Sequence, residues 1–189
     1  MPRTPLRTAL VPFAFFSLLG ACGSPRTGKP PPSEPSMPNQ TFSIEVSVSG
    51  DGTPAAVRCV ARNVSDHAVH VFDARRMPYL LDEEGALVVL HGVHPPPQDR
   101  DLNLIQIPTT RPLAAGESLT FEAALQPLQL HGHYGDEPSP PRHGPVKIVC
   151  RIAHGATPID AAAQHQLSIQ ALLEWQTLES SAVVVVQLP

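Results

Sequence analysis

The sequence is poor in aromatic and charged residues. Among 189 residues, 5% are Phe, Trp or Tyr and 16% are charged, with 13 Lys and Arg against 17 Asp and Glu. Surfaces that bind nucleic acid or anionic lipid usually carry a basic surplus, which this chain lacks. We therefore predict no nucleic-acid partner.

Motifs of the common enzyme classes are also missing. The sequence contains no Gly-x-Ser-x-Gly elbow, no His-Glu-x-x-His and no glycine loop of the kind that holds phosphate. Ser, His and Asp are frequent, so sequence alone leaves a catalytic triad open. We predict that the protein is not an enzyme and that it holds no cofactor.

What is present begins with an export signal. Arg3 and Arg7 precede an uncharged apolar stretch at 9–19, which is shorter than the roughly 20 residues that span a bilayer as a helix. The stretch runs into Leu19-Gly20-Ala21-Cys22, which resembles the lipobox of bacterial lipoproteins. The alternatives are an ordinary secretory signal cleaved near Ala21 and a buried apolar helix.

The lipobox resemblance implies that residues 1–21 are a signal peptide and that Cys22 becomes an acylated N-terminus. Several acyl chains would anchor the protein to a lipid bilayer, since each buried methylene contributes about 0.8 kcal/mol. Gly23 stands where an aspartate would favour the inner membrane. The implied location is the cell envelope, on the outer membrane.

Residues 22–40 are rich in Pro, Ser, Thr and Gly and have no apolar periodicity. This composition predicts a disordered tether, which as polyproline II at about 3.1 Å per residue would reach on the order of 50 Å. Once Arg3 and Arg7 are removed with the signal, 11 basic and 17 acidic residues remain, a formal charge of −6.

Two cysteines remain beside Cys22, at positions 59 and 150. Each lies among apolar residues that alternate with Arg or Lys, so both face the apolar side of an expected strand. An exported protein can keep a disulfide. We predict a Cys59–Cys150 bridge, which in the chain-entropy model stabilises by roughly 4 to 5 kcal/mol. Two separate buried thiols are the alternative.

Residues 41–189 suffice for one domain. Period-two alternation and Pro- or Gly-rich turns predict an all-β fold, an antiparallel β-sandwich of about eight strands. A hairpin connection is expected at 82–85. Strands are expected at 42–49, around Cys59, and at 69–72, 79–81, 86–90, 104–107, 118–123, 146–152 and 182–188.

The stretch 159–179 fits either a helix, by composition, or a strand, by alternation. A strand ending near Trp175 is slightly favoured, because it would lead into the Val-rich end of the chain. Trp175 is expected to be a core residue.

Two segments carry a second resemblance: Cys59-Val60-Ala61-Arg62-Asn63-Val64-Ser65-Asp66 and Leu113-Ala114-Ala115-Gly116-Glu117-Ser118-Leu119-Thr120-Phe121. They resemble immunoglobulin-like domains of bacterial envelope proteins and BsuPI-type proteinase inhibitors. The resemblance implies an immunoglobulin-like sandwich and little about activity. Trp175 follows the second cysteine, whereas in immunoglobulin domains it lies between the two.

Histidine is abundant. His131 and His133 would share one face of a strand, and His91 and His94 could add two more from a loop, with Asp99, Asp101, Asp136 and Glu137 as oxygen ligands. We nevertheless predict no metal site, because both pairs lie beside Gly and Pro clusters. A pH-sensing role is a further alternative. The remaining histidines are His67, His70, His143, His154 and His165.

The sequence thus predicts a non-catalytic envelope lipoprotein that binds another envelope protein or a glycan. The contact segments are expected at 92–100 and 135–145, because a sandwich places its connections at its ends. The alternative is a histidine-based metal-binding protein or an inhibitor-like module.

Overall fold

The computed structural model describes residues 40–49, 55–97, 108–137, 139–140, 142–159 and 167–188. The expected signal peptide, Cys22, nearly all of the tether, the expected strand at 104–107, and Asp99, Asp101 and His165 lie outside these residues. Within them, no helix has the length and apolarity needed to cross a membrane.

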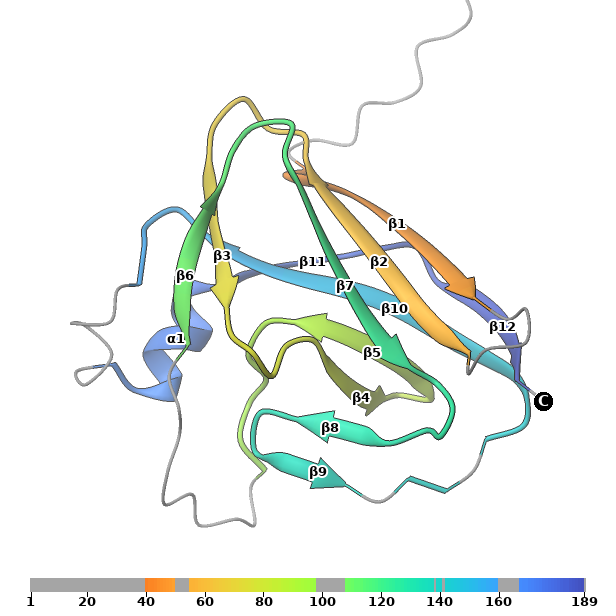
Figure 1. Ribbon diagram of the computed structural model, residues 1–189. Helices are drawn as coiled ribbons and strands as arrows, with labels where there is room; N and C mark the ends of the chain where they lie inside the picture. Colours follow the sequence, from red (N-terminus) through yellow and green to blue (C-terminus); the bar gives the residue numbers. More distant parts are fainter. Residues whose placement is uncertain are drawn as a thin grey trace, which may run out of the picture. The chain divides into compact units, whose positions relative to one another are not determined.

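Two β-sheets form the domain, which confirms the predicted all-β sandwich (Figure 1). The smaller sheet has the order β1-β2-β7, and its pairings are antiparallel. Its strands are β1 (Phe42–Ser49), β2 (Ala56–Asn63) and β7 (Ser118–Ala124).

The larger sheet has nine strands and is centred on the long strand β10 (Gly144–Gly155). The order is β6-β3-β10-β5-β4-β8-β9, and two further strands, β11 and β12, pair with β10. The β5–β10 pair is parallel, unlike the others. The strands besides β10 are β3 (Val69–Asp73), β4 (Tyr79–Glu83), β5 (Ala86–His91), β6 (Thr109–Leu113), β8 (Leu130–Gly132), β9 (Gly135–Glu137), β11 (Thr177–Ser180) and β12 (Val184–Leu188).

The hairpin expected at 82–85 joins β4 to β5. Glu84 and Gly85 both have positive φ, 49° and 81°. Positive φ at both central residues is the signature of a type I′ turn, whose twist matches that of the paired strands. Four strands, β6, β8, β9 and β11, were not expected. Strands β8, β9 and β11 have only three or four residues, too few to show alternation, and the β6 sequence Thr-Thr-Arg-Pro-Leu contains a proline and does not alternate.

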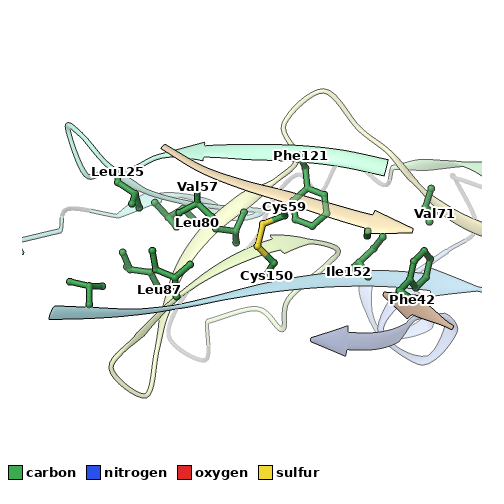
Figure 2. Packing of buried hydrophobic residues seen from close by; sticks show 14 of the residues in the cluster. Phe42, Val57, Cys59, Val71, Leu80, Leu87, Phe121, Leu125, Cys150 and Ile152 are labelled. Carbon is green, nitrogen blue, oxygen red and sulfur yellow. A yellow bond between two sulfur atoms is a disulfide. The ribbon is translucent and has the colours of Figure 1, made fainter. Parts of the chain in front are cut away.

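The main core lies between the two sheets (Figure 2). Val57, Cys59 and Ala61 of β2 are fully buried, while Arg58 and Arg62 on the alternate face are exposed. The same alternation in β10 buries Val146, Ile148, Cys150 and Ile152. Period-two patterning therefore places one face of each central strand in a shared apolar layer.

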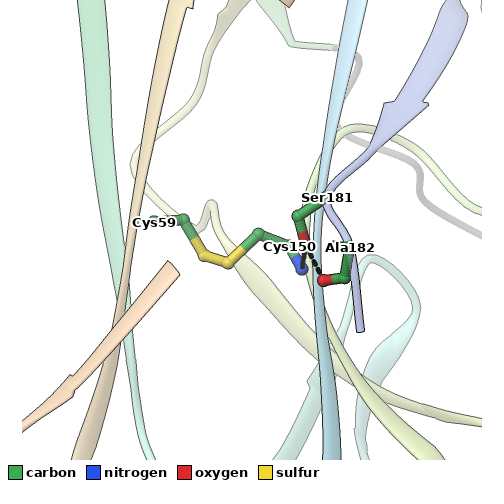
Figure 3. The surroundings of a disulfide bond; sticks show 4 residues. All are labelled: Cys59, Cys150, Ser181 and Ala182. Carbon is green, nitrogen blue, oxygen red and sulfur yellow. Dashed lines mark hydrogen bonds between the residues drawn. A yellow bond between two sulfur atoms is a disulfide. The ribbon is translucent and has the colours of Figure 1, made fainter. Parts of the chain in front are cut away.

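A disulfide crosses this layer from β2 to β10, as predicted (Figure 3). Cys59 and Cys150 are fully buried, and their Cα atoms are 6.0 Å apart. Ser181 satisfies the backbone of Cys150: its Oγ accepts from the Cys150 N–H at 3.1 Å, and its own N–H donates to the Cys150 carbonyl at 2.9 Å.

The strand favoured up to Trp175 is wrong, because Ile169–Trp175 is the helix α1. Ser168 caps it by accepting from the Ala171 N–H at 3.1 Å. Leu172 is fully buried, and Ile169 packs beside it at helical spacing. Trp175, expected in the core, is half-buried and packs at the margin of a second apolar cluster, with its ring centroid 4.9 Å from that of Phe72.

Asn63 joins the two segments that carried the immunoglobulin-like resemblance. This fully buried side chain donates to the carbonyls of His67 and Leu113, and its Oδ1 accepts from the Ser65 N–H at 3.0 Å. Its backbone carbonyl accepts from Gly116 N–H at 2.8 Å. Asn63 thereby connects the β2–β3 turn to the β6–β7 turn.

The first residues of β1 are held by a carboxylate from the other sheet. Glu179 of β11 accepts from the N–H of Thr41 at 3.0 Å and from that of Phe42 at 2.9 Å. Its side chain is 15% exposed and also contacts His154 Nε2 at 3.2 Å. The N-terminal end of the small sheet is thus fastened to the large sheet.

Replacing Glu179 by Ala is expected to lower the free energy of unfolding by roughly 2 kcal/mol, because two half-buried N–H groups lose a charged acceptor. E179Q should lose less, since it keeps one oxygen. The measurement is urea unfolding of both variants, with E45A on an exposed position of β1 as the control. An E179A variant as stable as E45A would contradict the role of the carboxylate.

Candidate functional site

Three histidines and two tyrosines gather at one end of the large sheet. Tyr79 lies on β4, on the face of the sheet opposite to the main core, where it packs with Val88 and Leu90. The ring centroids of His94, His131 and His133 lie 6.0, 5.5 and 5.9 Å from that of Tyr79. Tyr134 completes the cluster, 5.0 Å from His94.

Hydrogen bonds determine how the rings of His94 and His133 are oriented. The backbone N–H of His133 donates to His94 Nε2 at 2.9 Å, and His94 Nδ1 lies 3.2 Å from the Pro95 carbonyl. These partners require the proton of His94 on Nδ1. His133 Nδ1 lies 3.0 Å from the Tyr79 hydroxyl, whereas its buried Nε2 has no hydrogen-bond partner.

His131 is bound differently, by two acceptors. Its Nδ1 lies 2.7 Å from Asp136 Oδ1, and its Nε2 lies 3.0 Å from the Arg76 carbonyl. Both contacts become hydrogen bonds only when both ring nitrogens carry a proton. The hydrogen bond to His131 holds the pKa of Asp136 below its usual value.

Gly132 is required for this close packing. A Cβ atom there would lie 2.9 Å from His94 Nε2, closer than non-bonded atoms approach. Glycine therefore lets the 92–97 segment lie directly against the β8–β9 connection.

Burial keeps most of these rings neutral. It lowers the pKa of His94, and it lowers the pKa of His133 to about 4, with nearby His94 and Arg76 adding to the effect on His133. Burial also raises the pKa of Tyr134 to about 12. The cluster at neutral pH is consequently a surface of aromatic rings and hydrogen-bonding groups.

The alternative of a histidine metal site finds no support in this geometry. Among the described residues, no three His, Cys, Asp or Glu side chains are placed to hold a metal ion. The physical reason is that a ligating imidazole needs a free lone pair, and those of His94 and His131 already face protein partners.

A groove of about 250 Å³ adjoins the cluster and is lined by rings, prolines and acids. We call it the Tyr134 groove. Its rim includes Asp82 and Glu83, which pair with Arg142 and Arg151. Its lining is Leu80, Leu81, Asp82, Glu83, His94, Pro95, Pro97, Leu130, His131, Gly132, Tyr134, Gly135 and Glu137.

The described parts of the two expected contact segments meet in this groove. Pro95 and Pro97 come from 92–100, and Gly135 and Glu137 come from 135–145. Sequence reasoning missed Tyr79 and Tyr134, although these are the two tyrosines of the chain. The available signal was that the chain has only two tyrosines and that one of them, Tyr134, directly follows His133.

His91 does not join the cluster. It lies in β5 on the core side of the sheet, 6% exposed, with its ring centroid 5.4 Å from that of Phe121. Alternation along the strand therefore separates His91 from His94, which lies beyond the end of β5. His67 is exposed beside Asp66, and His154 contacts Glu179.

A larger hollow, of about 580 Å³, lies on the outer face of the small sheet. Ser43, Glu45, Arg62 and Ser118 line it, with no aromatic ring and no histidine among the lining residues. These are the outward positions of β1, β2 and β7, so the hollow is a solvated polar face and we do not regard it as the candidate site.

Comparison with protein-family models, with curated proteins and with solved structures finds no match to this chain.

Acid is expected to destabilise the protein through His91. Burial lowers the pKa of His91 to about 4, so the folded chain keeps it neutral while the unfolded chain binds a proton below about pH 6.5. Its contribution is complete above pH 6.5 and is lost as the pH falls toward 4. At pH 5 the loss is about 2 kcal/mol.

Urea unfolding at pH 7 and pH 5 measures this effect. H91L should lose about 2 kcal/mol less than the wild type between the two pH values. The exposed-site variant H67Q is the control and should behave like the wild type. An H91L variant with the full pH dependence would show that other groups cause it.

Proposed function

We propose that this chain is a membrane-anchored envelope lipoprotein whose β-sandwich binds a protein or a glycan at the Tyr134 groove without catalysis. The main support is that two proline-containing segments distant in sequence, 92–100 and 135–145, both contribute to one groove that also contains aromatic rings. Binding sites of this kind combine apolar walls with a few placed polar groups.

The rings around the groove suit recognition by stacking and hydrogen bonding. His94 and Tyr134 stand nearly perpendicular, at 87°, and form a corner of the groove. Acidic side chains at the rim add acceptors for hydroxyl or amine groups of a ligand. The ring orientations are preset by the bonds of His94 and Tyr134 to neighbouring backbone, which reduces the entropy cost of binding.

The anchor rests on the lipobox resemblance at Cys22. The expected result is that the wild-type chain incorporates labelled palmitate in a bacterial host and sediments with membranes. C22S should lose the label and appear in the soluble fraction, because no acyl chain can attach. A wild-type chain without label would refute the lipoprotein assignment.

The groove is tested by placing a photo-crosslinking amino acid at Pro95 and, as the control, at Thr120 on the exposed face of the small sheet. Envelope proteins should be crosslinked from position 95 and not from position 120.

A glycan array tests the groove for a glycan ligand. The affinity of the purified full chain for an arrayed glycan should fall at least tenfold with Y134A, corresponding to about 1.4 kcal/mol. Equal crosslinking at both positions, together with array binding that Y134A leaves unchanged, would contradict the groove as the site.

A further inference from the structure

The edge of the large sheet formed by β11, β12 and the residues between them exposes much of the apolar surface that the described residues leave uncovered. The structure describes four exposed large hydrophobic residues, and three of them lie on this edge: Leu178 is 44%, Val183 57% and Val185 63% exposed. β12 pairs with β10 on one side, and no described strand pairs with its other side.

The backbone of β12 offers hydrogen-bonding groups on that open side. The N–H and C=O of Cys150 both point toward the β11–β12 edge, where they bind Ser181. By alternation, Ile148 and Val146 point the same way, toward their register partners Val184 and Val186. The N–H and C=O of Val185 therefore point away from β10.

Devices that usually block edge pairing are missing from this strand. β12 has no charged residue and no proline between Val184 and Leu188. The irregular backbone around Ser181 lies before β12, and the five residues of β12 keep an unbroken register with β10.

We propose that β12 pairs antiparallel with β12 of a second copy of this chain, about a two-fold axis beside Val185. This axis opposes Val185 to its own copy and Val183 to Gln187. Both residues at the axis then exchange N–H···O=C bonds, and their β-branched side chains contact on one face.

Charge favours a second copy at this edge over other surfaces of the molecule. The chain carries a net negative charge, which opposes self-association at any surface, but β12 is uncharged and adds no local repulsion at this edge. The nearest register partner with a charge is Lys147, opposite Val185 on β10. The two copies of Lys147 would lie about 14 Å apart, three inter-strand spacings, beyond the Debye length of about 8 Å.

The extent of the edge sets the strength of the pair. Five residues span about 17 Å. A contact of that length buries less surface than a standard interface, which covers about 1,200 to 2,000 Å². The pair is accordingly weak in dilute solution. Anchoring both copies on one membrane would raise their effective concentration, a step that rests on the proposed lipid anchor.

Single-cysteine crosslinking of the full chain tests the register. Opposed residues of a hydrogen-bonded antiparallel pair have Cα atoms about 5.5 Å apart, within the range of a disulfide. Under mild oxidation at high protein concentration, V185C should yield at least five times more disulfide-linked homodimer than V183C. Val183 is the matched control, because it is similarly exposed but lies about 14 Å from its own copy in this register.

The double variant V183C/Q187C should crosslink again, since these positions face each other across the axis. Equal dimer yields from V185C and V183C would indicate random collision and overturn the proposal. No homodimer from V185C and from the double variant, or a V185C adduct with another protein in place of itself, would also overturn it. The wild-type chain measures any background from Cys22.

A charge at the axis provides an independent readout. V185K should shift the full chain toward monomer in sedimentation equilibrium, because two like charges would face each other. Its thermal midpoint should stay near that of the wild type, since the side chain is exposed. A V185K chain that self-associates as the wild type does would exclude this edge. These outcomes are independent of ligand binding at the Tyr134 groove.

Discussion

Burial of the facing sides of β2 and β10 is the interaction on which the rest of the structure depends. The two central strands contribute fully buried residues from both sheets, and the Cys59–Cys150 disulfide joins them at the middle of this layer. Apolar burial stabilises by about 25 cal/mol per Å². Because β10 pairs with four other strands, its position determines where β3, β5, β11 and β12 lie.

The candidate site uses the outer face of the same sheet. Leu80 of β4 points into the main core, and its neighbour Tyr79 points the opposite way and packs with Val88 and Leu90. A single strand therefore serves both the core and the site. The buried rings of the site stay neutral for the same reason that the core is stable, namely exclusion of water, which disfavours the imidazolium form.

Two edges of the large sheet, at β9 and at β12, differ in length and in composition. At β9 the sheet ends in a three-residue strand beside the Tyr134 groove, which is lined by side chains. At β12 it ends in an uncharged valine strand that presents backbone groups. A short edge limits pairing, whereas an uncharged one invites it. The proposed ligand site and the proposed self-association site thus lie on separate strands.

Local patterning in the sequence was sufficient to predict the long strands, the hairpin at Glu84-Gly85 and the cysteine pair, because alternation and turn chemistry act over a few residues. The strands β6, β8, β9 and β11 were not predicted, because they are too short or too irregular in sequence to show alternation. The helix α1 was not predicted, because 159–179 carries both a helical and an alternating pattern and tertiary packing of Leu172 and Trp175 decided between them. Only the tertiary structure could separate His91 from His94 and bring His94, His131 and His133 to Tyr79. The face on which a residue lies is a local property, but which faces meet depends on the pairing of strands far apart in the chain.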